Sequence, residues 1–377
     1  MRQLLRRSLF LRKIRFAPYI VLYWIACATV RIRPDRFLFL SDMHLGFTGN
    51  FAFLEAELRR QRPEAEIIGL FKRSFSARRS LGDAIRLPFL VASSRVIVLD
   101  DTFPIIYSFR IREGARLIQV WHAAGAFKQV GHSRIGLPGG PPAGSDMHKN
   151  YTAAPVASEG CRADYAEAFG LDISRVPALG VPRTDAFFDA DAVAETRRQV
   201  RKRLGVADDE RLVLCAPTFR GAGPVTARGT GASVWRDLAA ELGPGFRVAV
   251  RQHPFVTRQS GELPPELIDA SGGDMNELLM GVDVLVTDYS SSIFEYALMR
   301  RPYVLYVPDL DEYQDERAFY RPFDFYAAGA VVTEPERLAD AVREGRLDRV
   351  RLEAMLDEIC GALDGHSTER IVRELFL

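Results

Sequence analysis

Short apolar runs alternate with longer amphipathic stretches along the chain after residue 34. A short apolar run between turn residues predicts a buried strand, and apolar residues at helical spacing predict a helix packed on one face. The predicted strands are residues 36–41, 66–71, 95–100, 116–122, 151–156, 175–179, 211–216, 247–253, 282–287 and 303–307. The predicted helices are residues 51–62, 77–92, 160–169, 191–204, 234–242, 274–280 and 291–299, followed by three segments that start near 335, 348 and 367.

This alternation predicts an α/β fold, because strands separated by helices form parallel sheets covered on both faces. Two series of strands, joined by the highly charged helix 191–204, predict two doubly wound, Rossmann-like domains facing a cleft. The expected parts are a basic and apolar segment at 1–34, an N-terminal domain at 35–190 and a C-terminal domain at 191–377. The last helices are candidates for packing back on the N-terminal domain. Ligands of such folds bind outside the carboxyl ends of the strands, so motifs there matter most.

The composition narrows the class of protein. The chain has 377 residues, 47% of them hydrophobic and 26% charged, which are values of a globular protein. Its four cysteines form no CxxC motif, which argues against a structural zinc site and for a reducing compartment. Residues 1–34 hold eight basic and no acidic side chains, so the rest of the chain has a net charge of −7. A body of that charge argues against a nucleic-acid-binding protein.

The N-terminal segment raises the question of a membrane. Residues 16–30 carry no charge but include two Tyr and one Trp, between basic clusters. Fifteen residues are few for a spanning helix, which needs about 20. Aromatic residues between basic ones favour a segment that lies on an anionic membrane surface. A buried first helix remains an alternative, and so does a signal or anchor segment, because Ala26-Cys27-Ala28 resembles a cleavage site.

The strongest local motif is DVLVTDYSSSIFE at 283–295, where an apolar strand runs into a helix. Asp288 and Ser290 are good helix N-cap residues, so a well-capped helix is the simple interpretation. Three successive serines, Ser290, Ser291 and Ser292, exceed what a cap needs. Hydroxyls and free backbone N–H groups at a helix start can bind a phosphate, which makes this segment a candidate phosphate site.

Other candidates also follow predicted strands. His122, in QVWHAAGAFKQVG, is a candidate general base, although a lone His is more often a hydrogen-bonded structural residue. Lys128 in the same motif is either functional or a surface charge. The segment APTFR at 216–220 carries Arg220, which can bind an oxyanion with two hydrogen bonds. Arg251-Gln-His253-Pro254 fixes the direction of its His, but a plain turn explains it equally well.

Several familiar templates are absent from the sequence. It has no GxxxxGK[ST], GxSxG or HExxH motif, and no GxGxxG after the first strand. An ATPase, an α/β-hydrolase, a zinc hydrolase and a dehydrogenase are therefore disfavoured. No carboxylate cluster indicates a metal site, so no cofactor is expected to be required, and Mg²⁺ remains possible only on a bound diphosphate.

Taken in order, these motifs resemble the CDP-glycerol glycerophosphotransferase family, the polymerases and primases of teichoic-acid-like polymers. The resemblance covers about two thirds of the chain, from 116 to 371. Its segments are 119–131, 180–185 (GVPRTD), 216–220, 253–254, 283–308, 309–313 and 364–371 (DGHSTERI). It implies a glycosyltransferase-B-like fold, with an acceptor domain followed by a CDP-donor domain. It also implies attachment to the cytoplasmic face of the membrane, where a lipid-linked acceptor lies.

In such enzymes a hydroxyl of the acceptor attacks the β-phosphorus of CDP-glycerol and expels CMP. The resemblance implies that His122 is the base and that His253 contacts the donor phosphates. The residues expected to bind the donor diphosphate are Ser290, Ser291, Ser292, Asp288, Arg251, Arg220 and Thr218. Those expected on the acceptor side or in the cleft are Lys128, Arg183, Asp185 and Tyr313.

The sequence departs from the family pattern in places. The turn reads WHAAGAF where WHGTP-like is commoner, Glu295 stands where Asp is usual, and Ala328-Gly329 where Pro-Gly is usual. The first departure keeps CDP-ribitol open as the donor beside CDP-glycerol. A nucleotide-sugar glycosyltransferase of the same fold is a further alternative, and a non-catalytic nucleotide-binding scaffold is another.

Overall fold

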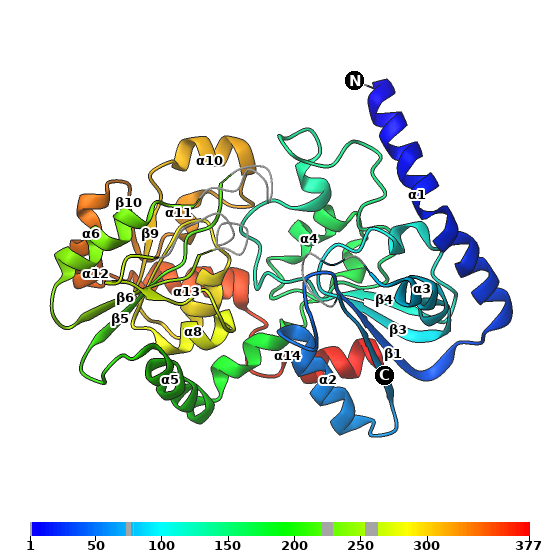
Figure 1. Cartoon of the computed structure of the whole chain (residues 1–377), viewed down its shortest axis with the longest axis horizontal. Coiled ribbons are helices and arrows are strands. Elements are labelled where there is room, and N and C mark those ends of the chain that lie inside the picture. Colours follow the sequence, from blue (N-terminus) through cyan, green and yellow to red (C-terminus); the bar gives the residue numbers. More distant parts are fainter. Residues whose placement is uncertain (1, 73–76, 78, 221–228, 253–262) are drawn as a thin grey trace. The chain divides into compact units, whose positions relative to one another are not determined.

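The computed structural model describes residues 2–72, 77, 79–220, 229–252 and 263–377, with only the helical backbone for 2–14. The chain divides into two compact units (Figure 1). Unit 1 comprises residues 1–122, 130–183 and 362–377, and unit 2 comprises residues 123–129 and 184–361. The chain therefore passes from one unit to the other several times.

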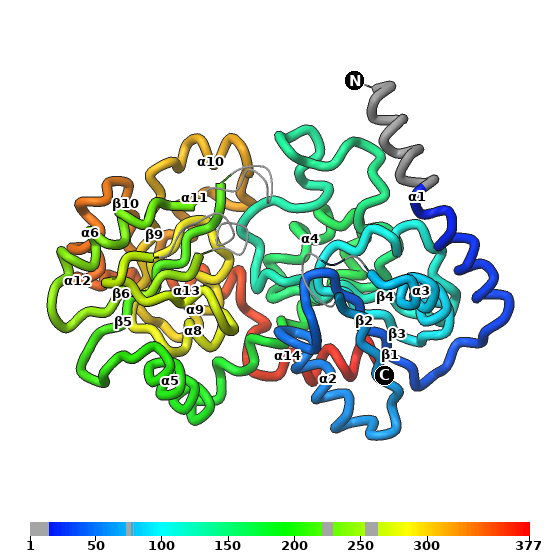
Figure 2. Tube along the Cα trace, viewed as in Figure 1, coloured from blue at the N-terminus to red at the C-terminus, as the bar shows by residue number. Residues whose placement is uncertain are grey.

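Unit 1 is built on a parallel sheet in the order β2-β1-β3-β4. These strands are Glu66–Leu70, Arg33–Leu40, Ser94–Leu99 and Arg116–Gln119. The main helices of this unit are α1 (Arg2–Thr29), α2 (Asn50–Gln61), α3 (Leu81–Ser93), α4 (Arg162–Phe169) and α14 (Ser367–Ile371). The end of the chain returns to this unit, where Ile371, Val372 and Phe376 join its buried core (Figure 2). Phe376 packs against Phe37 and Phe39 of β1.

Helix α1 packs along α3 with one face (Figure 1). Phe16, Tyr23 and Ala26 are buried, and their spacing of seven and three residues places them on one side of a helix. The Tyr23 ring stacks on Phe109 with centroids 4.4 Å apart, and its hydroxyl donates to the carbonyl of Arg110 at 2.8 Å. Within the described residues no helix is long and apolar enough to cross a membrane.

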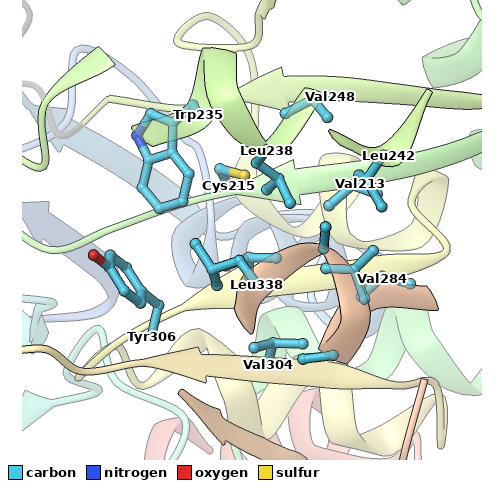
Figure 3. Packing of buried hydrophobic residues seen from close by; sticks show 14 of the residues in the cluster. Val213, Cys215, Trp235, Leu238, Leu242, Val248, Val284, Val304, Tyr306 and Leu338 are labelled. Carbon is cyan, nitrogen blue, oxygen red and sulfur yellow. The ribbon is translucent and has the colours of Figure 1, made fainter. Parts of the chain in front are cut away.

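Unit 2 is built on a second parallel sheet, in the order β10-β9-β8-β5-β6-β7. These strands are Ala330–Val332, Tyr303–Tyr306, Val284–Thr287, Arg211–Cys215, Phe246–Val250 and Ile268–Asp269. The main helices around it are α5 (Ala190–Leu204), α6 (Ala232–Leu242), α8 (Met275–Gly281), α9 (Ser292–Leu298), α10 (Leu310–Arg317), α11 (Phe323–Tyr326), α12 (Leu338–Glu344) and α13 (Arg349–Cys360). Figure 3 shows Trp235 and Leu238 of α6 and Leu338 of α12 packed on Val213 and Val304 of the strands.

The predicted α/β class is confirmed, with parallel sheets in both units. Two predicted strands are wrong. Within 151–156 only Ala153 pairs, through a single bridge to Ile118, and within 175–179 the chain follows a 3₁₀ turn at Ile173–Arg175. These segments run beside the sheet edge as loops, because their backbone bonds alternate between neighbours and prolines such as Pro155 and Pro177 interrupt pairing.

Candidate functional site

In the sheet of unit 2, the order in which successive strands are added reverses between β5 and β8. In the order β7-β6-β5-β8-β9-β10, strands β6 and β7 are added on one side of β5, and strands β8, β9 and β10 are then added on its other side. This is the strand order of a dinucleotide-binding fold. At such a point the loops that leave the two strands diverge and open a binding crevice. The loops here are 216–220 after β5 and 288–291 after β8, so two of the sequence motifs flank this point.

Asp288 joins these two loops. Its carboxylate is buried and accepts hydrogen bonds from the backbone N–H of Thr218 at 2.9 Å and from the Thr218 hydroxyl at 3.0 Å. It also accepts from Nη1 of Arg220 at 2.8 Å. Because a buried carboxylate with several donors is rigidly held, the loop 216–220 has a fixed conformation against β8.

Arg220 lies at the centre of a compact polar and aromatic cluster. Its guanidinium also pairs with Asp309, with Nε–Oδ2 at 2.5 Å and Nη2–Oδ1 at 3.0 Å. Burial lowers the pKa of Arg220, but the hydrogen bonds and charges of Asp309 and Asp288 outweigh it and raise that pKa overall. The Tyr289 hydroxyl donates to Asp309 at 3.0 Å. Arg220 is therefore permanently charged and held by two carboxylates.

Aromatic rings complete this cluster. Tyr289 and Tyr313 stack with centroids 3.7 Å apart, and the guanidinium of Arg220 lies 5.0 and 4.9 Å from their centroids. Lys128 donates from Nζ to the Tyr313 hydroxyl at 3.3 Å. The cluster thus carries two cations, Arg220 and Lys128, beside a stacked aromatic pair.

The serines after Asp288 form the start of α9. The Ser290 and Ser292 hydroxyls lie 2.8 Å apart, and Ser290 Oγ accepts from the backbone N–H of Ser292 at 3.3 Å. Ser290 therefore takes the capping role, while the Ser291 side chain makes no cap bond and is partly exposed. This arrangement agrees with the expected helix cap and leaves the hydroxyl of Ser291 available to a ligand.

Arg251 follows β6, the strand next to β5. Its Nη1 donates to the carbonyls of Ala270 and Gly272 at 3.2 and 3.3 Å. Burial lowers its pKa from the usual value for arginine. His253, two residues on, lies outside the described residues.

His122 belongs to unit 1 and follows β4 through a strained turn. Trp121 has a φ of 50°, an uncommon conformation for a bulky residue. Gln119 Oε1 accepts from the Trp121 N–H at 2.9 Å, and Asn50 Nδ2 donates to the Trp121 carbonyl at 2.7 Å. Arg183 Nη2 donates to the His122 carbonyl at 2.8 Å. Three side chains therefore hold this turn, so the surrounding structure maintains its strained conformation.

The imidazole of His122 is half exposed and faces acidic groups. Its Nδ1 lies 3.4 Å from the carbonyl oxygen of Asp100 and 3.6 Å from Oδ2 of Asp101. These oxygens favour a proton on Nδ1, which leaves a free lone pair on Nε2. On the neighbouring β1–α2 connection, His44 Nε2 pairs with Oδ2 of the buried Asp100 at 2.8 Å.

A buried hydrogen-bond network around Tyr151 holds Gln119, which bonds the turn at Trp121. The Tyr151 hydroxyl contacts the Tyr107 hydroxyl at 2.9 Å, Nε2 of Gln119 at 2.9 Å and Nδ1 of His148 at 3.1 Å. Burial, with a smaller effect of nearby His132, lowers the pKa of His148 to about 3. His148 is therefore neutral at physiological pH and acts in packing.

The structure brings most of the predicted residues into two groups. Arg183 lies beside His122 in unit 1, and Asp185 lies in the 3₁₀ turn Pro182–Phe188 and falls within unit 2. The unit 2 group holds Thr218, Arg220, Asp288, Ser290, Ser291, Ser292, Lys128 and Tyr313. In the described part of the chain, no three His, Cys, Asp or Glu side chains are grouped to hold a metal ion.

Sequence reasoning missed Asn50, Gln119, Asp101, Tyr289 and Asp309. Tyr289 lies in the motif 283–295 and Asp309 in the motif 309–313, so both could have been chosen as site residues from the sequence. Asn50 contacts a residue 71 positions away, and no local pattern reveals such a partner.

The fold and these two groups define a glycosyltransferase-B-like α/β protein with a nucleotide-binding type of sheet in unit 2. A model of the CDP-Glycerol:Poly(glycerophosphate) glycerophosphotransferase family matches residues 22–377. The chain belongs to this family.

Two curated relatives show the same affiliation. The chain is 37% identical to the teichoic acid poly(ribitol-phosphate) polymerase of Bacillus spizizenii, over 91% of this chain and 56% of the relative. It is also 37% identical to the ribitol-phosphate polymerase TarK of Staphylococcus aureus, over 91% of this chain and 69% of the relative. The chain thus spans little more than half the length of the first of these relatives.

The wall teichoic acid polymerase TagF has a similar structure. Its TM-score is 0.77 at 20% sequence identity, and the match covers 96% of this chain and 95% of that chain. At this identity the likeness concerns the fold, and it supports the predicted glycosyltransferase-B-like class.

Proposed function

We propose that this protein transfers a polyol phosphate from a CDP-polyol to a hydroxyl of a teichoic-acid-like acceptor and releases CMP. The observation that carries the proposal is the group at the point where the unit 2 sheet changes direction. There Asp288, Arg220 and Thr218 fix two loops whose strand ends are the usual nucleotide site of such a sheet. Family membership supports the reaction type.

In the proposed reaction, the acceptor oxygen attacks the phosphorus that carries the polyol. The bond from this phosphorus to the CMP oxygen breaks, and the hydroxyl proton passes to Nε2 of His122. Asp101 and the carbonyl of Asp100 stabilise the protonated imidazole through Nδ1. Catalysis of this kind depends on positioning and on stabilising the phosphate charge.

The donor diphosphate is proposed to bind at Ser291 and neighbouring backbone N–H groups, with His253, Arg251 and Arg220 supplying donors. Asp288 is better explained as the residue that holds Thr218 and Arg220 in place, because these donors already occupy its oxygens. Lys128 and Tyr313 are proposed to contact the polyol end of the donor or the acceptor.

Ribitol phosphate is the polyol that the comparisons favour. Both relatives at 37% identity are ribitol-phosphate polymerases by name, whereas the family description names glycerol phosphate. The turn WHAAGAF, which departs from the commoner WHGTP-like form, agrees with this preference. CDP-ribitol is therefore proposed ahead of CDP-glycerol, which was the first expectation from sequence.

The protein is also proposed to attach to the cytoplasmic face of a membrane without crossing it. The face of α1 that points away from unit 1 exposes Val21 (51%), Trp24 (67%) and Ile25 (47%). An exposed row of large apolar side chains with an aromatic residue, next to basic residues, suits the interface of an anionic bilayer. A lipid-linked acceptor would then lie at the same surface.

The experiment that tests the function measures CMP release and donor binding. Calorimetric titration with CDP-ribitol, CDP-glycerol, CMP and UDP-glucose identifies the donor before the acceptor is known. We expect preference for a CDP-polyol, lost in the Ser290→Ala/Ser291→Ala double variant. Ser133→Ala, in the 3₁₀ turn Gly131–Arg134 of unit 1, is the control. Binding of UDP-glucose alone would assign the protein to sugar transfer.

The role of His122 has its own test. His122→Ala should keep donor binding and lower turnover by about 10²–10⁴-fold, the usual size of a general-base effect. His366→Ala, an exposed His of the same unit, should leave both unchanged. A His122→Ala variant with near wild-type turnover would remove this residue from the mechanism.

A further inference from the structure

A groove of about 440 Å³ lies in unit 1 between the end of α1, the start of β1 and helix α3. This volume is within the range of about 300–1,000 Å³ that is typical of ligand sites. Its apolar lining comes from Val30, Ile85, Phe89 and Leu90. Ile85 and Phe89 are four residues apart on α3, so they follow one another along one side of the helix.

Arginines line the same groove. They are Arg31, Arg33, Arg36 and Arg86. Two carboxylates face them. Glu66 pairs with Arg36 at 2.9 Å and with Arg33 at 3.0 Å, and Asp83 lies 3.9 Å from Arg86.

The four arginines therefore exceed their carboxylate partners by two charges. Among the residues that the structure describes, Arg31 has no carboxylate partner. An apolar groove with excess positive charge fits a ligand that has an alkyl chain and an anionic head.

Hydrogen bonds within unit 1 fix the walls of the groove. Nη1 of Arg112 donates to the carbonyl of Val30 at 2.8 Å and to that of Ala92 at 2.9 Å, which ties the end of α1 to the end of α3. Arg36 donates to the hydroxyl of the buried Ser93 at 2.5 Å. These bonds fix the two walls of the groove without any ligand.

The groove lies at the opposite edge of the sheet from His122. Its residues lie before or in the first half of β1 and before β3, whereas His122 and Asp100 follow the carboxyl ends of β4 and β3. Strand β1 has eight residues, and at about 3.3 Å per residue this separates the two edges by roughly 25 Å. A ligand in the groove is therefore not in a position to react at His122.

The groove is continuous with apolar surface. Leu81 and Ile85 of α3 are 78% and 46% exposed, and α1, which packs on α3, carries the exposed Trp24. Leu81, Ile85 and Phe89 are spaced by four residues, so they form one stripe that leads into the groove. A lipid whose alkyl chain lies along this stripe would bring its head group to the arginines.

We infer that this groove binds one anionic phospholipid, with an acyl chain against Ile85, Phe89 and Leu90 and the phosphate at Arg31 and Arg86. The inference rests on the proposed membrane attachment and goes beyond it. It assigns a lipid-specific site whose role is to select anionic membrane and to orient unit 1 on it. It also places this site away from the reacting groups.

The test uses the full chain in solution with a lipid monomer. Dihexanoylphosphatidylglycerol below its critical micelle concentration is titrated by calorimetry, with dihexanoylphosphatidylcholine and inorganic phosphate as comparisons. We expect saturable one-to-one binding of the anionic lipid, at least about tenfold weaker binding of the zwitterionic lipid, and no competition by phosphate. Lack of saturable binding, or equal affinity for the two lipids, overturns the inference.

Two variants localise the site. Arg31→Glu/Arg86→Glu should weaken binding of the anionic lipid by about tenfold or more, since two attractive charges beside the lipid phosphate become repulsive. The charge-matched control Lys202→Glu/Arg349→Glu changes exposed residues of unit 2 and should stay within twofold. Equal effects of the two pairs would indicate net charge alone and would overturn the site.

The variant Ile85→Trp distinguishes binding in the groove from general partition onto an apolar surface. Tryptophan strengthens general partition into a membrane interface, but here it fills the groove and should weaken monomer binding at least fivefold. Stronger monomer binding by this variant contradicts the inference. Each variant is checked by its melting temperature and by donor titration, which should match wild type. If the unsubstituted protein floats with vesicles but does not bind the lipid monomer, the groove is rejected and the attachment by α1 remains.

Discussion

Asn50 links the two segments that position His122. It is buried, donates to the Trp121 carbonyl, and accepts from the backbone N–H of Arg183 through Oδ1 at 3.1 Å. Both amide atoms are thus used. Arg183 adds a second link between these segments, because its Nη2 donates to the His122 carbonyl at 2.8 Å.

Asn50→Ala should lower the free energy of unfolding by about 1–3 kcal/mol, because it leaves buried backbone groups without partners. It should also reduce turnover while the affinity for the donor stays unchanged, since the proposed donor site lies in unit 2. Thermal unfolding and CMP release measure the two effects. Glu55→Ala on the same helix removes only a surface pair with Arg59 and is the control. Unchanged turnover in Asn50→Ala would show that the turn keeps its shape without this residue.

His148 makes the stability of the protein depend on pH. Its folded-state pKa of about 3 is below the unfolded value of about 6.5. The unfolded state therefore binds a proton more readily below pH 6.5, and stability is lost as the pH falls from about 6.5 toward 3. Each pH unit in that window costs up to about 1.4 kcal/mol from this residue.

Urea unfolding at pH 7 and pH 5 measures this loss. His148→Gln should make the difference between the two pH values smaller, whatever its own effect on stability. His366→Gln, which changes an exposed His, should leave the difference as in wild type. An identical pH dependence in His148→Gln would assign the effect to other groups.

Among the structural elements, α1 has one buried face and one exposed face. Tyr23→Ala should lower the free energy of unfolding by about 3–5 kcal/mol, because the ring is buried on Phe109. Its neighbour Trp24 is 67% exposed, so Trp24→Ala should change stability by less than about 0.5 kcal/mol and weaken binding to anionic vesicles. Chemical denaturation and vesicle flotation on the same two variants test the pair. The reverse pattern would mean that the described faces of α1 are wrong.

Most of the segment 16–30 lies in α1. It is a helix with a packed face, so deleting residues 1–34 is now expected to expose the surface under Tyr23 and destabilise unit 1.

Elements with strong local patterns were predictable from sequence. The second half of β1 (37–40) and most of β5, β8 and β9 are continuous apolar runs. Helix α5 is bounded by Asp189, which caps it, and by Gly205 in a left-handed conformation. The edge strands β7 and β10 were missed because two or three paired residues leave no periodic signal. Within the site, residues at strand ends were predictable from the fold rule alone. Asn50 and the pairing of Arg220 with Asp309 were not, because such partners are defined only by tertiary structure.

At the scale of the whole molecule, the chain end completes unit 1. Ile371, Val372 and Phe376 belong to the core that also contains Phe37 and Phe39. Arg370 fastens the segment further, since it pairs with Asp364 and donates to the carbonyl of Leu179.

Truncation after Gly361 should therefore destabilise unit 1 while unit 2 remains folded. Hydrogen exchange followed by mass spectrometry should show faster exchange in β1, β3 and α2 and little change in β5 and β8. A matched truncation that removes only Leu377, which is 40% exposed, should have little effect. Equal protection of unit 1 in both truncated forms would show that the terminal segment is dispensable.

The return of the chain to unit 1 also sets an order of assembly during synthesis. A ribosome makes the chain from its N-terminus, so residues 37–39 leave the tunnel long before the side chains that cover them. The main body of unit 2, at 184–361, is released without interruption before residues 362–377 follow. The unit that begins the chain is thus the last to be completed, and until then its apolar strands remain accessible to chaperones or to a nearby membrane.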